Sequence, residues 1–202
     1  MEIRAPAIVC ASRAHGETAA IARVFTREFG MLAGYVAGAR GRRMRPVLIP
    51  GNVVEADLRA RSSSQLPFLK LELVTSRGPW LTEPLPAAAI GWATTLAATV
   101  LPEHNPYPAL HDALSGLLEA ICNAPSARMW ALAMAKYEVL TLRELGFGGG
   151  EMPPVAENWD EILGILDSSG RQLSRRLLAD RRTNVMGARE VMMQRLARIS
   201  GG

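Results

Sequence analysis

The strongest constraint on the fold lies in residues 54–61, where apolar and charged side chains alternate without interruption. Successive side chains of an extended strand point to opposite faces, so this pattern separates the two kinds of residue completely. One face carries Val54, Ala56, Leu58 and Ala60, and the other carries Glu55, Asp57, Arg59 and Arg61. The segment therefore predicts a strand with one face in a core and the other in solvent.

Further strands are predicted on both sides of this segment. FLKLELV alternates in the same way, with Leu69, Leu71 and Leu73 on its expected core face. PAIVCASR is a short apolar run, and the segments on either side of Gly30 favour a hairpin. About five short strands without a long helix between them predict a small barrel, because closure leaves little sheet edge exposed.

The pattern changes after Gly78-Pro79. Residues 108–123 place apolar side chains on one helical face, and a third helix is expected from about Ser126 to Leu145, ended by Gly146. Asn158 and Glu161 have the spacing of a capping box that opens a further helix. We expect an α+β chain: a five-stranded β-barrel of the OB-fold type in residues 1–78, and an all-helical domain in residues 79–202.

The net charge of +4 conceals an uneven distribution. Residues 1–45 carry +5, residues 46–170 carry −7, and residues 171–202 carry +6. Arginine supplies 21 of the 23 basic residues, and its planar guanidinium suits phosphate better than the point charge of lysine. A basic head and tail around an acidic middle indicate a polyanionic partner.

Other classes of protein find little support in the sequence. No apolar run has membrane-spanning length and the first residues do not resemble a secretory signal, so we expect a cytoplasmic protein with no membrane partner. Cys10 and Cys122 lie far apart and predict free thiols, and no Cys or His pair has metal-ligand spacing. Phosphate-binding, nucleophile-elbow and zinc-protease motifs are missing. We expect a binding protein with no catalytic site, metal or cofactor.

The segment GARGRRMRP, residues 38–46, is the first candidate for DNA binding. The nearest acids in the sequence, Glu28 and Glu55, lie outside it, and its glycines permit close approach of the backbone to a ligand. The predicted phosphate contacts are Arg40, Arg42, Arg43 and Arg45, extended by Arg13, Arg23 and Arg27. The alternative is a solvated basic connection beside an exposed strand face. Since the head offers few aromatic rings, we expect sequence-indifferent contact with the backbone.

A second basic cluster lies near the C-terminus and includes Arg171, Arg175, Arg176, Arg181 and Arg182. Arg171 and Arg175 are spaced as neighbours on a helix and would repel each other without an anion or acid nearby. The cluster, with Arg175 and Arg176 at its centre, is a candidate second DNA surface. The alternative is a solvated helix face.

Several short motifs, in their order and spacing, resemble the bacterial RecO family of recombination mediators and DNA repair proteins. They are Gly16-Glu17-Thr18, FTREFG at residues 25–30, Gly38-Ala39-Arg40, KYEVLTLRELGFG at residues 136–148, and Gly187-Ala188-Arg189-Glu190. The resemblance implies an OB-fold head, a helical body and no catalytic turnover. Many family members carry a four-cysteine zinc module after the Leu-Gly-aromatic motif, whereas no cysteine follows Cys122 here.

The resemblance also implies partners. Such proteins bind single- and double-stranded DNA, anneal complementary strands, engage the C-terminal tail of single-stranded DNA-binding protein, act with RecR and help to load RecA. Lys136 stands at the basic position of the family motif and, with Arg143 seven residues on, is the expected site for the tail's carboxylate. The alternative for Lys136 is an ordinary ion pair with Glu138 or Glu119. The alternative for the whole chain is a helical protein-interaction adaptor that does not bind DNA.

Overall fold

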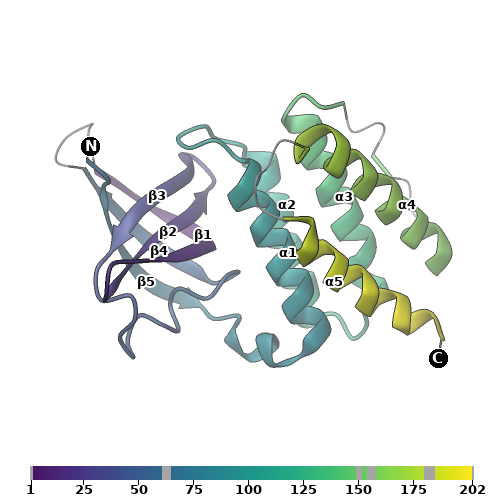
Figure 1. Cartoon of the computed structure of the whole chain (residues 1–202), viewed down its shortest axis with the longest axis horizontal. Helices are drawn as coiled ribbons and strands as arrows, with labels where there is room; N and C mark the ends of the chain where they lie inside the picture. The colour runs from purple at the N-terminus through teal and green to yellow at the C-terminus, as the bar shows by residue number, and fades with distance from the viewer. Residues whose placement is uncertain (1, 61–64, 149–151, 154–157, 180–184, 202) are drawn as a thin grey trace.

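The computed structural model describes residues 2–60, 65–148, 152–153, 158–179 and 185–201. Within them, a β-barrel at one end of the molecule is followed by a helical body at the other (Figure 1). The strands are β1 (Glu2–His15), β2 (Ala19–Thr26), β3 (Gly30–Val36), β4 (Val53–Arg59) and β5 (Phe68–Thr75). The α-helices are α1 (Pro84–Val100), α2 (Pro108–Asn123), α3 (Arg128–Glu144), α4 (Trp159–Gln172) and α5 (Met186–Ala197).

The strands close into a barrel in the order β1-β2-β3-β5-β4, with β4 pairing back onto β1. The long strand β1 makes this possible, because it pairs with β4 through its first half and with β2 through its second. Neighbouring strands are antiparallel except β3 and β5, which are parallel and share the single pair Tyr35–Phe68. The predicted five-stranded OB-type head and helical body are therefore confirmed.

The barrel interior follows the predicted alternation along β4. Val54, Ala56 and Leu58 are buried, and the charged residues between them point outward. The expectation for β5 was wrong at one position: Leu69 and Leu71 are buried, but Leu73 is 41 % exposed. Leu73 keeps the regular register opposite Val54, but it is the last regular pair before the pairing shifts by one residue, near the end of β5.

The hairpin of β2 and β3 turns at Gly30, as predicted. Its φ of +71° lies in the left-handed region that favours glycine. A Cβ at this position would also collide with the backbone of Asn105 in the link between α1 and α2. Glycine therefore lets the hairpin and this link lie against each other.

The helical body packs directly on the barrel. Ile8, Phe25 and Met31, from three strands, join a single hydrophobic cluster with Trp92 and Leu96 of α1. Arg77, only 3 % exposed, adds a polar tie because its guanidinium donates to Glu119 of α2. The barrel and the helical body are thus joined by a shared hydrophobic core and not by a linker alone.

A buried ion pair ties the helices together. Glu138 of α3 is completely buried and pairs with Arg189 of α5, whose Nε lies 2.8 Å from Oε1. The same carboxylate accepts hydrogen bonds from Trp92 Nε1 of α1 at 2.7 Å and from Ser169 Oγ of α4. Gly170 lies beneath the guanidinium of Arg189, where a Cβ would collide with it. One carboxylate therefore fixes four helices against one another.

The predicted helix signals are also confirmed. Residues 108–123 form α2, and Gly146 adopts a φ of +81° just after α3. Asn158 Oδ1 accepts a hydrogen bond from the Glu161 backbone at 2.9 Å, which caps the start of α4. Among the described residues, no helix combines the length and apolar character required to cross a membrane.

Candidate nucleic-acid interface

The candidate interface is built around residues 38–46, called here the arginine loop, which connects β3 to the segment before β4. Gly38, with φ +63°, starts the turn, and the Gly41 amide donates to the Gly38 carbonyl at 2.9 Å. The Arg45 amide donates back to the Gly41 carbonyl at 3.1 Å. The Arg40 amide donates to Thr18 at 3.2 Å, so the loop rests on the turn between β1 and β2.

The base of the arginine loop is fixed to the barrel. Val47 and Leu48 are buried in the barrel core, and Met44 packs against it. The side chain of Asn52, itself completely buried, donates to the carbonyls of Pro46 at 2.7 Å and Val47 at 3.1 Å. A loop held in this way presents its side chains with little of the entropy loss that ordering a mobile segment would cost on binding.

The side chains of this loop carry the positive charge. Arg40, Arg42, Arg43 and Arg45 are all exposed. In the part of the chain that the structure describes, no carboxylate lies within ion-pair distance of any of them. Each guanidinium therefore keeps its donors for an external acceptor, and the fork of an arginine matches the oxygens of a phosphate.

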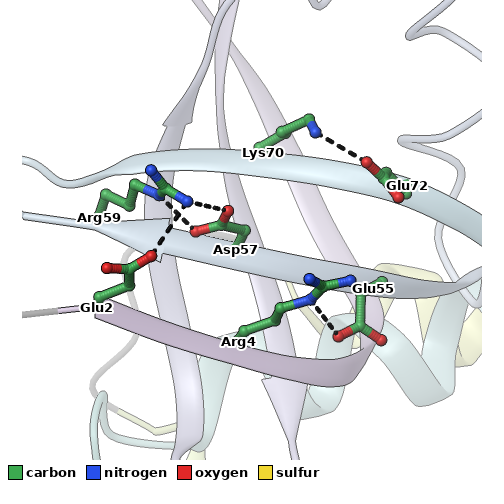
Figure 2. Close-up of polar contacts among 7 residues, drawn as sticks. All are labelled: Glu2, Arg4, Glu55, Asp57, Arg59, Lys70 and Glu72. Atoms are coloured by element: carbon green, nitrogen blue, oxygen red, sulfur yellow. Dashed lines mark hydrogen bonds and ion pairs between the residues drawn. The ribbon is translucent and has the colours of Figure 1, made fainter.

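The outer face of β1, β4 and β5 has a different character. Seven charged residues cross these strands and are called here the charge ladder: Glu2, Arg4, Glu55, Asp57, Arg59, Lys70 and Glu72 (Figure 2). Arg59 pairs with Asp57 at 2.9 Å and with Glu2 at 3.1 Å. Arg4 pairs with Glu55 at 3.3 Å, and Lys70 with Glu72 at 2.8 Å. Three cations face four carboxylates, so this face has no free positive charge to offer a polyanion.

Two of these pairs favour the ionised form of their carboxylate. The hydrogen bond from Arg59 lowers the pKa of Asp57, and the hydrogen bond from Lys70 lowers the pKa of Glu72. Charged hydrogen-bond donors stabilise the anionic form of an acid, which is the direction seen at both positions. Asp57 and Glu72 therefore remain charged, and continue to neutralise Arg59 and Lys70, at neutral pH.

Two of the three other arginines predicted for the head are engaged with the helical body. Arg13 is exposed near the end of β1 and makes no ion pair among the described residues. Arg23 donates to Glu103 at 2.8 Å and to the carbonyl of Leu101 at 3.1 Å, which ties β2 to the end of α1. Arg27 lies at the opposite end of β3 from the loop and donates to both carboxylate oxygens of Asp112 of α2. Arg23 and Arg27 are thus engaged within the protein.

The described arginines of the C-terminal cluster, Arg171, Arg175 and Arg176, lie on the helical body. Arg175 and Arg176 belong to a π-helical turn, Leu173–Leu177, that continues α4, and both are exposed. Arg176 donates to the carbonyl of Phe147 at 2.9 Å. Arg171 is exposed in the last turn of α4, whereas Arg181 and Arg182 lie outside the described residues. The described arginines of this cluster thus belong to the helical body, whereas the arginine loop belongs to the barrel.

Lys136 and Arg143 both lie on α3, as predicted. Lys136 is half-buried and Arg143 is exposed. The two acids that could have neutralised Lys136 are engaged elsewhere: Glu138 with Arg189, and Glu119 with Arg77. Within the described residues Lys136 has no ion-pair partner, so its ammonium can receive an external carboxylate.

Thiol chemistry is disfavoured at the buried cysteine. Cys10 and Cys122 are free thiols, the first buried and the second half-buried. Burial raises the pKa of Cys10 to about 12, so its sulfur stays protonated and poorly nucleophilic. The described residues contain no cluster of His, Cys, Asp and Glu suited to a metal ion.

Comparison with known proteins shows which family has this sequence. A family model described as "Recombination protein O N terminal" matches residues 1–77, and one described as "Recombination protein O C terminal" matches residues 83–148. The DNA repair protein RecO of Phenylobacterium zucineum is 35 % identical over 178 residues, which cover 87 % of this chain and 72 % of that protein. The chain belongs to the RecO family.

Two further RecO proteins show the extent of the similarity. The Rhodospirillum centenum protein is 44 % identical over 149 residues, covering 73 % of this chain and 58 % of its own length. A Rhizobium etli protein, from strain CIAT 652, is 37 % identical over 171 residues, covering 84 % of this chain and 65 % of its own. The chain thus spans about three fifths to three quarters of the length of these RecO relatives.

Sequence reasoning missed two groups in this RecO chain. Asn52 follows a glycine in a loop-like segment, and no sequence signal marks it as the side chain that holds the base of the arginine loop. Tyr35 and Phe68 meet on the outside of the barrel with ring centroids 5.5 Å apart. The alternation of FLKLELV already placed Phe68 on the face opposite Leu69, so that signal was present.

Proposed function

We propose that this RecO-family chain is a DNA repair mediator that binds single- and double-stranded DNA through its backbone and anneals complementary strands. The observation that carries the proposal is the arginine loop, whose four exposed guanidinium groups have no carboxylate partner among the described residues. Family membership supports it, because the curated relatives are named as DNA repair proteins. The protein acts by binding, without chemical turnover.

Annealing requires two strands to approach despite the repulsion between their phosphates. The arginine loop neutralises the phosphates of one strand and releases its counterions, which makes binding depend on salt and hardly on sequence. The separate cluster at Arg175 and Arg176 supplies a second positive surface for the other strand. Two basic surfaces on one molecule raise the local concentration of one strand near the other.

The partner site lies on α3. Lys136, whose candidate internal partners are occupied by other residues, receives the terminal carboxylate of the tail of single-stranded DNA-binding protein, with Arg143 beside it. Binding to this tail brings the chain to coated single strands. There it acts with RecR and helps RecA to load.

The annealing reaction tests the proposal. Complementary oligonucleotides coated with single-stranded DNA-binding protein are mixed with the parent chain, and duplex formation is followed by fluorescence energy transfer. We expect acceleration by the parent, and a loss of it in the Arg42→Ala/Arg43→Ala variant. A matched variant, Arg4→Ala/Arg59→Ala, removes two arginines of the charge ladder and should anneal like the parent. If the parent neither binds DNA nor accelerates annealing, the chain is instead a protein-interaction adaptor.

The tail site has its own test. A fluorescent peptide with the sequence of the tail of single-stranded DNA-binding protein is titrated with the parent and with Lys136→Ala. We expect the variant to bind more weakly, while the matched variant Lys70→Ala, which removes the other lysine of the chain, binds normally. Normal peptide binding by Lys136→Ala would exclude this site and leave the DNA-binding proposal untouched.

A further inference from the structure

The barrel is closed at one seam by a single residue pair. β3 and β5 run parallel and share only Tyr35–Phe68, with the Tyr35 amide donating to the Pro67 carbonyl at 2.8 Å. Beyond this pair the two strands share no further pairing, and a pocket of about 440 Å³ opens beside it. This volume lies within the range of small-molecule sites, roughly 300–1,000 Å³.

Aromatic rings form one wall of this pocket. Phe68 is 54 % exposed, the largest fraction among the four phenylalanines of the chain. Its ring lies edge-on to that of Tyr35, and Tyr35 in turn contacts the ring of His15 with centroids 6.0 Å apart. Tyr35 therefore supports Phe68 by a ring contact, while about half of the Phe68 surface remains exposed to solvent. Such a flat, supported, exposed ring is a platform for stacking.

Positive charge borders the same pocket. Arg43 and Met44 of the arginine loop line it, together with Lys70 and Glu72 of β5. Lys70 and Glu72 pair with each other at 2.8 Å and so nearly cancel. Arg43 has no ion-pair partner among the described residues, so the pocket joins an apolar aromatic wall to one available guanidinium. A nucleotide combines the same two features, a flat ring and a phosphate.

We propose that this pocket binds one unpaired nucleobase, stacked on Phe68, while Arg43 contacts the adjoining phosphate. The inference rests on the proposed DNA binding and adds a preference to it. Bases in a duplex are stacked on their neighbours and cannot enter the pocket, so it favours single strands over duplex DNA. Stacking tolerates every base, since each has a flat π face, and the preference is therefore independent of sequence.

Abasic DNA separates stacking from backbone contact. Binding is measured for an oligothymidine and for an oligonucleotide of equal length in which every position is an abasic sugar. We expect Phe68→Ala to bind the oligothymidine about 5- to 150-fold more weakly than the parent, the range for one lost stacking contact. Its affinity for the abasic strand and for duplex DNA should equal that of the parent. Phe68→Trp should restore the affinity for oligothymidine.

A matched control removes another exposed ring. Phe29 is 36 % exposed in the turn between β2 and β3, outside the pocket, and Phe29→Ala should bind like the parent. Equal losses on the normal and abasic strands by Phe68→Ala would assign the ring a structural role and overturn the proposal. If Phe68→Ala bound both strands as the parent does, the proposed stacking in the pocket would be wrong, while the proposed DNA binding would stand. A parent that binds neither strand would overturn the proposed function and the pocket together.

Discussion

The arginine loop and the charge ladder lie on the same barrel, and both contain arginines. Among the described residues, the loop offers a surface with unpaired positive charge, whereas the ladder offers one whose charges are paired. In the ladder, Arg4 and Arg59 face carboxylates across neighbouring strands, at 3.3 Å and 2.9 Å (Figure 2). In the loop, Arg42 and Arg43 extend from a turn, and no carboxylate of the described residues lies within ion-pair distance of them. The difference teaches that an arginine marks a phosphate site only when its neighbours leave it unpaired.

A third kind of arginine sharpens the comparison, because Arg189 is buried and paired with a buried carboxylate. Arg189→Ala should have the largest effect on folding, lowering the free energy of unfolding by about 3–5 kcal/mol, since Glu138 would remain buried without its partner. Urea denaturation followed by circular dichroism measures this loss. Arg59→Ala, in the exposed ladder, should unfold at the midpoint of the parent. An Arg189→Ala protein as stable as the parent would contradict the role given to this pair.

The loop's fixed base distinguishes it from a flexible basic tail. Asn52→Ala removes two hydrogen bonds to the carbonyls of Pro46 and Val47 and one from the amide of Arg77. We expect the free energy of unfolding to fall by about 1–3 kcal/mol, because buried polar groups lose their partners. Hydrogen exchange should accelerate at residues 41–48. Unchanged exchange there would show that the arginine loop does not depend on Asn52.

Removing carboxylates from the charge ladder should leave its arginines with fewer ion-pair partners, which brings them closer to those of the arginine loop. Glu55→Gln/Asp57→Asn removes two carboxylates and leaves Arg4 without its partner and Arg59 with Glu2 alone. We expect the log–log salt slope of single-strand binding to become steeper, by up to about 0.7 for each arginine that gains a phosphate contact. The control Glu83→Gln/Asp167→Asn makes the same change in net charge on the helical body. An equal effect of both variants would point to net charge rather than to local pairing.

The smallest effect is expected at Arg27. Its hydrogen bonds to both carboxylate oxygens of Asp112 raise the pKa of the guanidinium and keep it engaged with the helical body. Arg27→Ala should therefore leave the affinity for single-stranded DNA and its salt dependence unchanged in a fluorescence anisotropy titration. A clear loss of affinity would indicate that DNA binds at the end of β3 that lies opposite the arginine loop.

Local sequence patterns predicted the strands and helices because these elements depend on interactions between residues that are close in the chain. The alternation around Val54 and the cap at Asn158 depend on residues close in the chain, and the structure has both. Leu73 was placed wrongly because its alternation does not show where the core ends along the strand, which depends on the elements that surround β5. Closure of the barrel at Tyr35–Phe68 likewise joins residues far apart in sequence.

The candidate site was predictable only in part for the same reason. The arginine loop was visible as a run of basic residues without a nearby acid in sequence, and its freedom from carboxylates persists among the described residues. The acids that pair with Arg23 and Arg27 could not be identified from a local pattern, even though Glu28 follows Arg27 directly. Their partners, Glu103 and Asp112, lie about 80 residues away. Whether an arginine is free is therefore a property of the fold.

The salt dependence of single-strand binding tests this account most directly. The logarithm of the binding constant is measured against the logarithm of salt concentration for the parent, for Arg42→Ala/Arg43→Ala and for Arg4→Ala/Arg59→Ala. The account predicts that the loop variant has a shallower slope, by about 0.7 for each arginine removed, and that the ladder variant keeps the slope of the parent. An unchanged slope in the loop variant, or an equal change in both, would contradict it.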